Sequence, residues 1–509
     1  MTPTELKDPE YGLNGLNTGK VSSITSMKQD VTYAEDIAAE ARMKLAEMDP
    51  AIRAQIRRKI DLNVMPLAIA GYLVAFIDRS NAGNAKLLGL VDDLHLTGYR
   101  FNIALSAFFC TYVTLEIPAN LLCKKFGPKR WLPILVSWFG LTTMCFAFAE
   151  TYAAFVGLRI MLGVAEAGIM PGTAYMLSTF YRRHELAGRI GIYASFASLS
   201  GAFGGLLATG FSKIPPWGII HTWRNIFFFE GLITMAVGVC MYFFIPAGPS
   251  VARFLTPAER ELAARVIELE VLSSGPSRSI RLKDVAAAFN FPNTVMVLAS
   301  AACLLTMNSL SLFVPSIINA MGYSAIRSQL LSVPPYAFAT VVCIVFSIYS
   351  DRIKRRGVPM LLLLPIGMVG FILHLTVKSP GVRYFAVFLS MVPAFTGSPT
   401  LLAWSMDNSA GPTVRAVAGA IQAGFGNLGG LLATWTFLSK DARNGYKSGN
   451  AINLGGMVIA ALSIAVVVLY YKWENAAREK GHRDHLLEGL TREEVENLGN
   501  KHPGFRYTL

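Results

Sequence analysis

The chain has 509 residues, of which 53% are hydrophobic and 16% charged, and its formal net charge is +13. So apolar a composition excludes an ordinary set of soluble domains and indicates a membrane protein. The positive charge does not indicate a nucleic-acid partner, because the basic residues stand in short segments between apolar runs. In that position they are typical of cytosolic loops and of contacts with anionic membrane lipid.

The amino-terminal region is polar over about the first sixty residues. Its opening, MTPTELKDPE, lacks the basic and apolar regions of a cleavable signal peptide. We therefore expect a cytosolic tail over residues 1–60. The six cysteines lie in or beside apolar runs without CxxC spacing, which favours packing roles over a disulfide or zinc framework.

About twelve apolar runs follow, each near the roughly 20 residues that a helix needs to cross a bilayer. Their cores are residues 62–78, 103–123, 131–150, 153–180, 190–212, 226–245, 292–318, 333–350, 359–377, 383–405, 415–438 and 451–472. An even number of crossings places both termini on one side. Basic clusters at 57–59, 124–130, 182–189 and 351–356 indicate that this side is the cytosol.

A polar segment over residues 247–290 divides the apolar runs into two sets, 61–246 and 291–473, and residues 474–509 form a second cytosolic tail. Within the polar segment, Thr256 is placed to cap a helix that starts at Pro257, with Glu259 three residues after the cap. We predict a cytosolic amphipathic helix that joins two halves.

A weak internal repeat relates the two halves. NLLCKKFGPKR (120–130) and SIYSDRIKRRG (347–357) each follow the second apolar run of their half and carry basic clusters at matching spacing. Parallel halves of six helices, with the substrate site between them near mid-membrane, are the major facilitator plan. The predicted fold class is therefore an all-α membrane protein with twelve transmembrane helices in two six-helix halves.

Several motifs carry a more specific resemblance. The two repeated loops resemble the facilitator loop motif, and Arg159 with Gly163 resembles its fourth-helix signature. Taken with FIDRSNAGNA, EIPANLLCKKFGPKRWLP, WRNIFFFEGL, LSVPPYA, DNSAGPTVRAVAGA, GNLGG and HPGFRYTL, they make residues 55–509 similar to the fungal allantoate permease family of the anion:cation symporters. The resemblance implies transport of a small organic anion, such as nicotinate, allantoate, pantothenate or biotin, commonly together with a proton. We also expect a monomer in the plasma membrane.

The first candidate site residues are Asp78 and Arg79, next to an apolar run where a charge is unfavourable by about 2.5–3.5 kcal/mol. The resemblance implies that Arg79 binds the substrate anion and that Asp78 takes part in proton coupling. A guanidinium fork suits a carboxylate, and Asp78 either shares the proton or holds Arg79 in position. The alternative is a pair that stabilises a helix end. Phe76 stands where relatives often have tyrosine, which removes a phenol contact.

The second candidate pair is Arg159 and Glu166, which are seven residues apart and so project from one helix face about 10 Å apart along the axis. Small residues surround Glu166 and leave room for a ligand or for close helix packing. We predict that Glu166 is the main proton carrier and that Arg159 contributes to substrate binding. The alternative for Arg159 is a structural charge network.

From the second half, Asn308 and Asn427 are candidate substrate contacts, and the alternative is a bond between neighbouring helices. Glu116 and Glu230 are interpreted as architectural. We find no nucleophile elbow, zinc motif or nucleotide-binding loop, so we expect neither an enzyme nor a cofactor beyond the proton gradient. Export of a fungal metabolite and a transporter-like nutrient sensor stay open as alternative functions.

Overall fold

The computed structural model describes residues 43, 49–273, 288–410, 412–490, 495 and 498–509. The first group of helices comprises α2 (Pro50–Ala85), α3 (Val91–Asp93), α4 (Arg100–Phe126), α5 (Pro128–Cys145), α6 (Tyr152–Glu166), α7 (Ile169–Ser178), α8 (Arg183–Ser212) and α9 (Trp223–Phe244). The second comprises α12 (Phe291–Asn319), α13 (Ala325–Ile353), α14 (Gly357–Thr376), α15 (Pro380–Asp407), α16 (Pro412–Gly426), α17 (Leu428–Ala433) and α18 (Lys447–Glu479). Between the groups lies α10 (Pro257–Ser273).

Ten helical segments in the described part of the chain are long and apolar enough to cross a membrane. Two shorter apolar helices, Phe196–Ser212 and Val417–Ala433, coincide with predicted runs at 190–212 and 415–438. The all-α membrane fold class is confirmed, and the count of twelve crossings stays a prediction.

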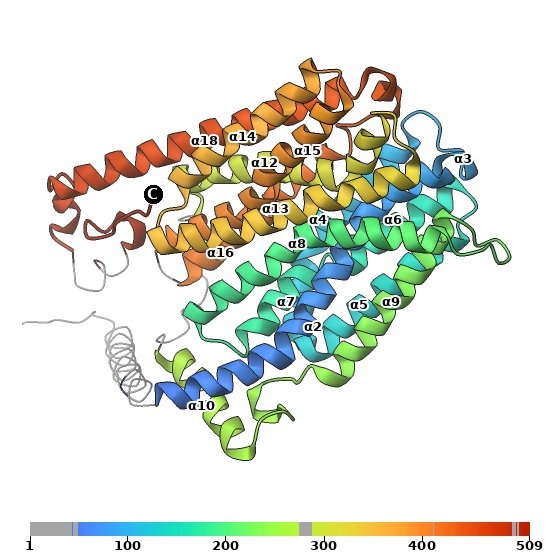
Figure 1. Ribbon diagram of the computed structural model, residues 1–509. Coiled ribbons are helices and arrows are strands. Elements are labelled where there is room, and N and C mark those ends of the chain that lie inside the picture. The colour runs from blue at the N-terminus through green and yellow to red at the C-terminus, as the bar shows by residue number, and fades with distance from the viewer. Residues whose placement is uncertain (1–42, 44–48, 274–287, 411, 491–494, 496–497) are drawn as a thin grey trace, which may run out of the picture.

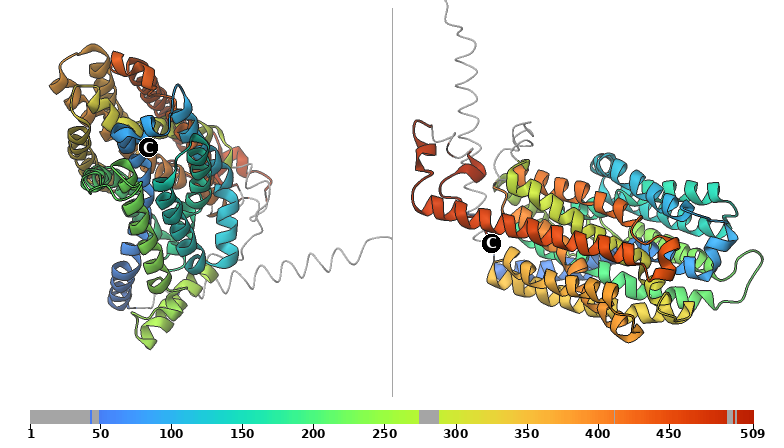
Figure 2. Two further views of the ribbon diagram at one scale, coloured as in Figure 1. Left: turned by 90° about the vertical axis from the view of Figure 1, so that its right-hand side faces the viewer. Right: turned by 90° about the horizontal axis from the view of Figure 1, so that it is seen from above.

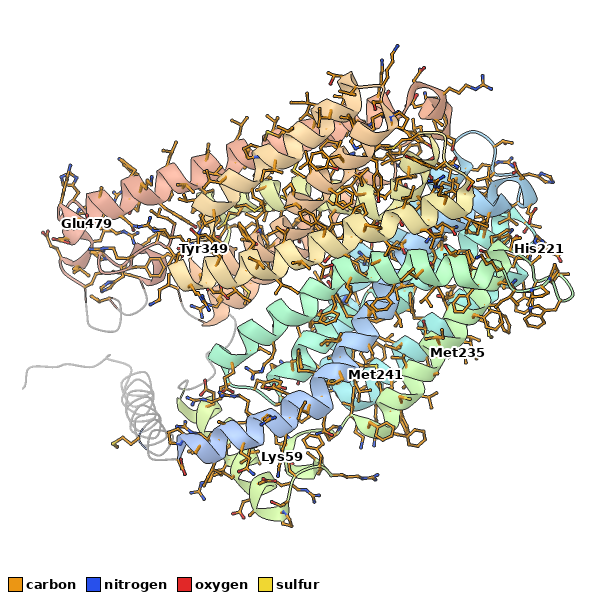
Figure 3. The ribbon with its side chains drawn as sticks, viewed as in Figure 1. Lys59, His221, Met235, Met241, Tyr349 and Glu479 are labelled. Carbon is orange, nitrogen blue, oxygen red and sulfur yellow. The ribbon has the colours of Figure 1, made fainter. Side chains whose placement is uncertain are left out.

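The two groups of helices lie side by side (Figure 1). Seen from above, α18 runs along the outside of the second group (Figure 2). Lys59 and Glu479 lie at the end of the molecule that carries α10, whereas His221 lies at the opposite end (Figure 3). Toward the α10 end the axes of the two groups spread apart, and toward the His221 end they converge (Figure 1).

Close contacts between the groups lie toward the His221 end. Near the last turn of α2, a Cβ at Gly83 would overlap the carbonyl oxygen of Leu312 on α12, so a glycine is needed for this backbone approach. A second contact joins α4 to the residue after α17: Asn102 Nδ2 donates a hydrogen bond of 2.5 Å to the carbonyl oxygen of Thr434. These contacts hold the two groups together at this end.

Helix boundaries differ from the predicted runs in two ways. The runs at 153–180 and 415–438 are each interrupted, the first between α6 and α7 and the second at Asn427, between α16 and α17. By contrast, α2 continues to Ala85, seven residues beyond the predicted core of the first run. Asp78 and Arg79 therefore lie inside a helix, so the alternative that they stabilise a helix end is wrong.

The predicted cap of α10 is confirmed. The backbone N–H of Thr256 donates to Glu259 Oε2 at 2.9 Å, and the backbone N–H of Glu259 donates to Thr256 Oγ1 at 3.3 Å. Glu259 also pairs with Lys59 of α2 at 2.7 Å, and Arg182, just before α8, pairs with Glu270 at 2.8 Å. In the described part of the linker, α10 is thus attached to the first group of helices.

The contact of α10 with α2 should depend on pH. The hydrogen bond from Lys59 is the main cause that lowers the pKa of Glu259 below its ordinary value. Because the pKa is lower when α10 is docked, the carboxylate stabilises docking at neutral pH, and this contribution disappears as the pH falls through the lowered pKa. Glu259→Gln should increase amide hydrogen exchange in α10 at neutral pH, and the difference from wild type should vanish in acid.

Glu261→Gln, on an exposed residue of the same helix, is the matched control. Equal exchange in wild type and Glu259→Gln at neutral pH would contradict the role given to the Lys59–Glu259 pair.

The closing segment, residues 498–509, folds back onto the second group. The ring of Tyr507 stacks on that of Tyr471 of α18, with centroids 4.3 Å apart and planes inclined by 8°. Trp404 Nε1 of α15 donates to the carbonyl oxygen of Thr508 at 2.8 Å. Further hydrogen bonds join the segment to Arg356, Asn408, Asn475 and Arg478. The segment thus links the α10-side ends of α14, α15 and α18.

Tyr507→Ala should release this segment. Loss of a large buried side chain is unfavourable by about 3 kcal/mol, so trypsin should cut after Arg506, which is exposed, much faster than in wild type. The matched control is Glu479→Ala, an exposed change at the end of α18. If Tyr507→Ala and Glu479→Ala are cut at the same rate, the stack with Tyr471 does not hold the segment in place.

Candidate functional site

A buried ion pair between α2 and α6 forms the centre of the candidate site. Arg79 donates from Nε at 2.9 Å and from Nη2 at 2.5 Å, both to Oε1 of Glu166. The two residues are 7% and 3% exposed. Glu166 is the last residue of α6, and Gly163, one turn earlier, packs so closely on α4 that a Cβ would meet the carbonyl oxygen of Phe108. Small residues thus bring α4 and α6 together where the ion pair lies.

Aromatic rings surround the Arg79 guanidinium. Its central carbon lies 4.5 Å from the ring centroid of Phe76 and 5.2 Å from that of Tyr112, with Phe108 and Phe109 at 5.8 and 5.9 Å. Such faces attract a cation and exclude water from it. The three rings from α4 come from the run FFCTY, residues 108–112, whose importance the sequence analysis missed. The spacing of Phe108 and Tyr112 by four residues was the available signal.

Asp78 has different partners from its neighbour Arg79. Its Oδ1 accepts a hydrogen bond of 3.3 Å from Thr143 Oγ1, and its Oδ2 lies 3.9 Å from Nη1 of Arg159. The expectation that Asp78 holds Arg79 in position is therefore wrong. Successive residues of a helix point about 100° apart, so Asp78 and Arg79 turn to different residues of α6.

Arg159 is buried by this arrangement. Its guanidinium lies 4.9 Å from the ring centroid of Phe146 and 5.3 Å from that of Phe155, and its ion-pair partner in the described chain is Asp78. The structural charge network that the sequence left open for Arg159 is thus present. Arg159 and Glu166 lie two turns apart on α6 and pair with two consecutive residues of α2: Arg159 with Asp78, and Glu166 with Arg79.

The two asparagines from the second group lie beyond the aromatic rings. Asn308 Nδ2 donates to the carbonyl oxygen of Leu304 at 2.9 Å, and Asn427 Nδ2 donates to Glu116 Oε2 at 3.3 Å. Gly430 lies between the side-chain amide of Asn308 and the ring of Phe109, because a Cβ at Gly430 would contact both. The structure therefore brings Asn308 next to a ring that lines Arg79, although neither asparagine hydrogen bonds with Arg79 in the described structure.

The bond from Asn427 also gives Glu116 a partner across the two groups of helices. Glu116 lies one turn after Tyr112 on α4, and Asn427 stands at the break between α16 and α17. Among the described residues, no group of three His, Cys, Asp or Glu side chains is placed to hold a metal ion. The site is thus a set of buried charges, amides and aromatic rings.

Comparisons with known proteins agree on the family. Residues 68–434 match the model of the Major Facilitator Superfamily. The chain is 33% identical to the MFS-type transporter cnsO of Penicillium expansum over 90% of this chain and 91% of that protein. It is 31% identical to the high-affinity nicotinic acid transporter of Saccharomyces cerevisiae over 89% of this chain and 84% of that protein.

Among solved structures, a D-xylose-proton symporter superposes with a TM-score of 0.62 at 14% identity, over 79% of this chain and 97% of that one. At this identity the superposition shows the fold alone. The family match and the relatives together show a membrane transporter, not an enzyme. The chain belongs to the Major Facilitator Superfamily.

Proposed function

We propose that this transporter takes up a small organic anion together with a proton by alternating access, as an anion:cation symporter of the fungal allantoate permease family. The observation that carries the proposal is the buried pair of Arg79 and Glu166. Arg79 is a cation suited to a carboxylate, and its present counter-ion is a side chain that a proton can neutralise. We also propose that both termini lie in the cytosol and that the membrane is the plasma membrane.

Replacement of Glu166 by the substrate anion as the counter-ion of Arg79 would couple binding of the anion to binding of the proton. A substrate carboxylate that binds Arg79 takes the place of Glu166, and a buried carboxylate left without its cation is unfavourable by about 3–5 kcal/mol. Protonation of Glu166 removes that penalty, so anion and proton bind best together. The proton also cancels the charge of the anion, whose entry against an inside-negative potential requires about 2.3 kcal/mol per 100 mV.

The rings around Arg79 favour a planar substrate. Phe76, Phe108, Phe109 and Tyr112 lie near the guanidinium, and offset stacking with an aromatic acid adds about 0.5–1.5 kcal/mol to burial. We therefore propose that the substrate is a nicotinate-like aromatic carboxylate rather than a ureide. The 31% identity to the yeast nicotinic acid transporter supports this choice.

The other predicted residues take supporting roles in this proposal. We propose that Asn308, beside Phe109 and Gly430, donates to the substrate from the second group of helices in place of its bond to Leu304. Asn427 would do so on releasing Glu116. Arg159 acts through Asp78 rather than by direct contact, because Asp78 is its ion-pair partner in the described chain.

Arg79→Lys should keep the charge and lose the planar donors. Hydrogen bonds to charged groups contribute about 1.5–3 kcal/mol, so the affinity for nicotinate should fall by about tenfold or more, and Arg79→Ala should be worse. Uptake of radiolabelled nicotinate and competing small carboxylates is measured in yeast lacking its own vitamin and ureide permeases. Arg443→Lys, on an exposed residue of the loop before α18, is the control. Normal affinity in both Arg79 variants at equal surface expression would remove Arg79 from the site.

Glu166→Gln should separate binding from coupling. Glutamine has nearly the volume of a protonated glutamate, so vesicles should still exchange internal for external nicotinate but should not accumulate it when the outside is made acid. Glu150→Gln, on an exposed residue between α5 and α6, should accumulate normally. Accumulation by Glu166→Gln vesicles under the same pH gradient would show that another group carries the coupled proton.

A further inference from the structure

Another buried carboxylate, Glu230 on α9, has no counter-ion in the described structure. It is 5% exposed. Its Oε2 accepts a hydrogen bond from Nδ2 of Asn81 on α2. Its Oε1 has no hydrogen-bond partner among the described residues, and no ion pair of Glu230 occurs there. A buried charge with one neutral donor is strongly disfavoured, so Glu230 is most stable when it carries a proton.

The charges around Glu230 do not balance if all acids are ionised. Three buried carboxylates, Asp78, Glu166 and Glu230, lie around the two paired arginines, whereas a further buried acid, Glu116, accepts a hydrogen bond from Asn427 farther along α4. Arg79 pairs with Glu166, and Arg159 lies 3.9 Å from Asp78. One proton on the three acids restores neutrality, and Glu230 is the acid that lacks a cation.

A small cavity joins Glu230 to Asp78. It has a volume of about 20 Å³ and is lined by the polar residues Asp78, Thr143, Glu230 and Thr234, together with apolar residues of α2, α8 and α9. A cavity above about 10–15 Å³ with two to four polar partners can hold one water molecule. Asp78 Oδ2, like Glu230 Oε1, lacks a hydrogen-bond partner in the described structure.

The other ionisable groups near α9 point elsewhere. Arg224, on the same helix, donates to the carbonyl oxygen of Ala147 at 2.7 Å. Lys86, beyond the end of α2, lies over the rings of Phe101 and Phe313. The groups from α5 and α8 that line the cavity, Thr143 and Leu207, do not titrate in the working pH range. Asp78 is therefore the titratable group that faces Glu230 across the cavity, with Arg159 behind it.

We propose that Asp78 and Glu230 form a second proton-binding site, in which one proton is shared across the cavity through a single water molecule. Glu230 Oε1–H gives its proton to the water, and the water gives one of its own to Asp78 Oδ2, so the charge of the pair does not change. With one proton, Asp78, Glu230 and Arg159 together are neutral. When the proton leaves, they carry one negative charge.

The use of this site in transport rests on the proposed function, although proton binding itself does not. Arg159 and Glu166 stand on the same helix, α6. Loss of the proton from the Asp78–Glu230 site leaves two negative carboxylates that repel each other across the cavity, and one of them, Asp78, is the ion-pair partner of Arg159. Any shift of α6 that follows would reach the Arg79–Glu166 pair, so the two sites are mechanically linked.

Infrared difference spectroscopy of the full-length protein in lipid vesicles tests the proposal without substrate. Wild type should show the carbonyl stretch of a protonated carboxylic acid at neutral pH, and this band should disappear in a jump to alkaline pH. Glu230→Gln, which can still accept the bond from Asn81, should remove the band, and Glu230→Asp should restore it. Glu166→Gln and the exposed control Glu150→Gln should keep it. A band that persists in Glu230→Gln, or is lost only in Glu166→Gln, would overturn the assignment.

Two further variants test whether the proton is shared. Asp78→Asn should change the pH at which the band disappears. Thr234→Val should also change this pH, although it leaves all three carboxyl groups in place, because it removes one hydrogen-bond partner of the water molecule. An unchanged titration in both variants would show that Glu230 acts alone and would overturn the shared site. Because no substrate is present, failure of nicotinate uptake in wild type would contradict the proposed function and leave the result of this test standing.

Discussion

Compensation of buried charge is the constraint on which the interior of the first group of helices depends. Two consecutive residues of α2, Asp78 and Arg79, carry opposite charges into an apolar environment, and α6 supplies the opposite charge for each through Arg159 and Glu166. A lone buried charge would be strongly unfavourable, so neither helix can rotate or slide without disturbing both pairs. The same pairs fix how α2 and α6 face each other and which groups a ligand or proton can reach.

Close helix packing makes this arrangement possible. Gly163 lets α6 approach α4, which brings Phe108 and Tyr112 over the guanidinium of Arg79. Gly83 allows α2 to contact α12 at the end where the two groups of helices converge. The charged centre therefore lies next to the interface between the groups, and Asn427 and Glu116 join them there directly. The helices that carry and line the charged centre, α2 and α4, thus also carry contacts between the two groups.

Local patterns predicted the parts of the structure that depend on neighbours in sequence. The length of the apolar runs indicated an all-α membrane protein, and the spacing of Thr256 and Glu259 predicted a cap that the hydrogen bonds confirm. The partners of Asp78 and Arg79 could not be predicted from such patterns. Their adjacency in the sequence suggests that they pair with each other, whereas helix geometry points the two side chains in different directions. The aromatic surroundings of Arg79 and the isolation of Glu230 likewise depend on how separate helices pack, which a single sequence does not specify.

The two polar elements at the wide end of the molecule are each attached to one group of helices. Ion pairs of Glu259 and Glu270 fasten α10 to the first group, and the stack of Tyr507 on Tyr471 fastens the closing segment to the second. Each of these two elements should therefore move together with the group of helices to which it is attached. A donor and an acceptor fluorophore, one on an exposed position of each element, would report the separation of the groups in real time without a label inside any membrane-crossing helix.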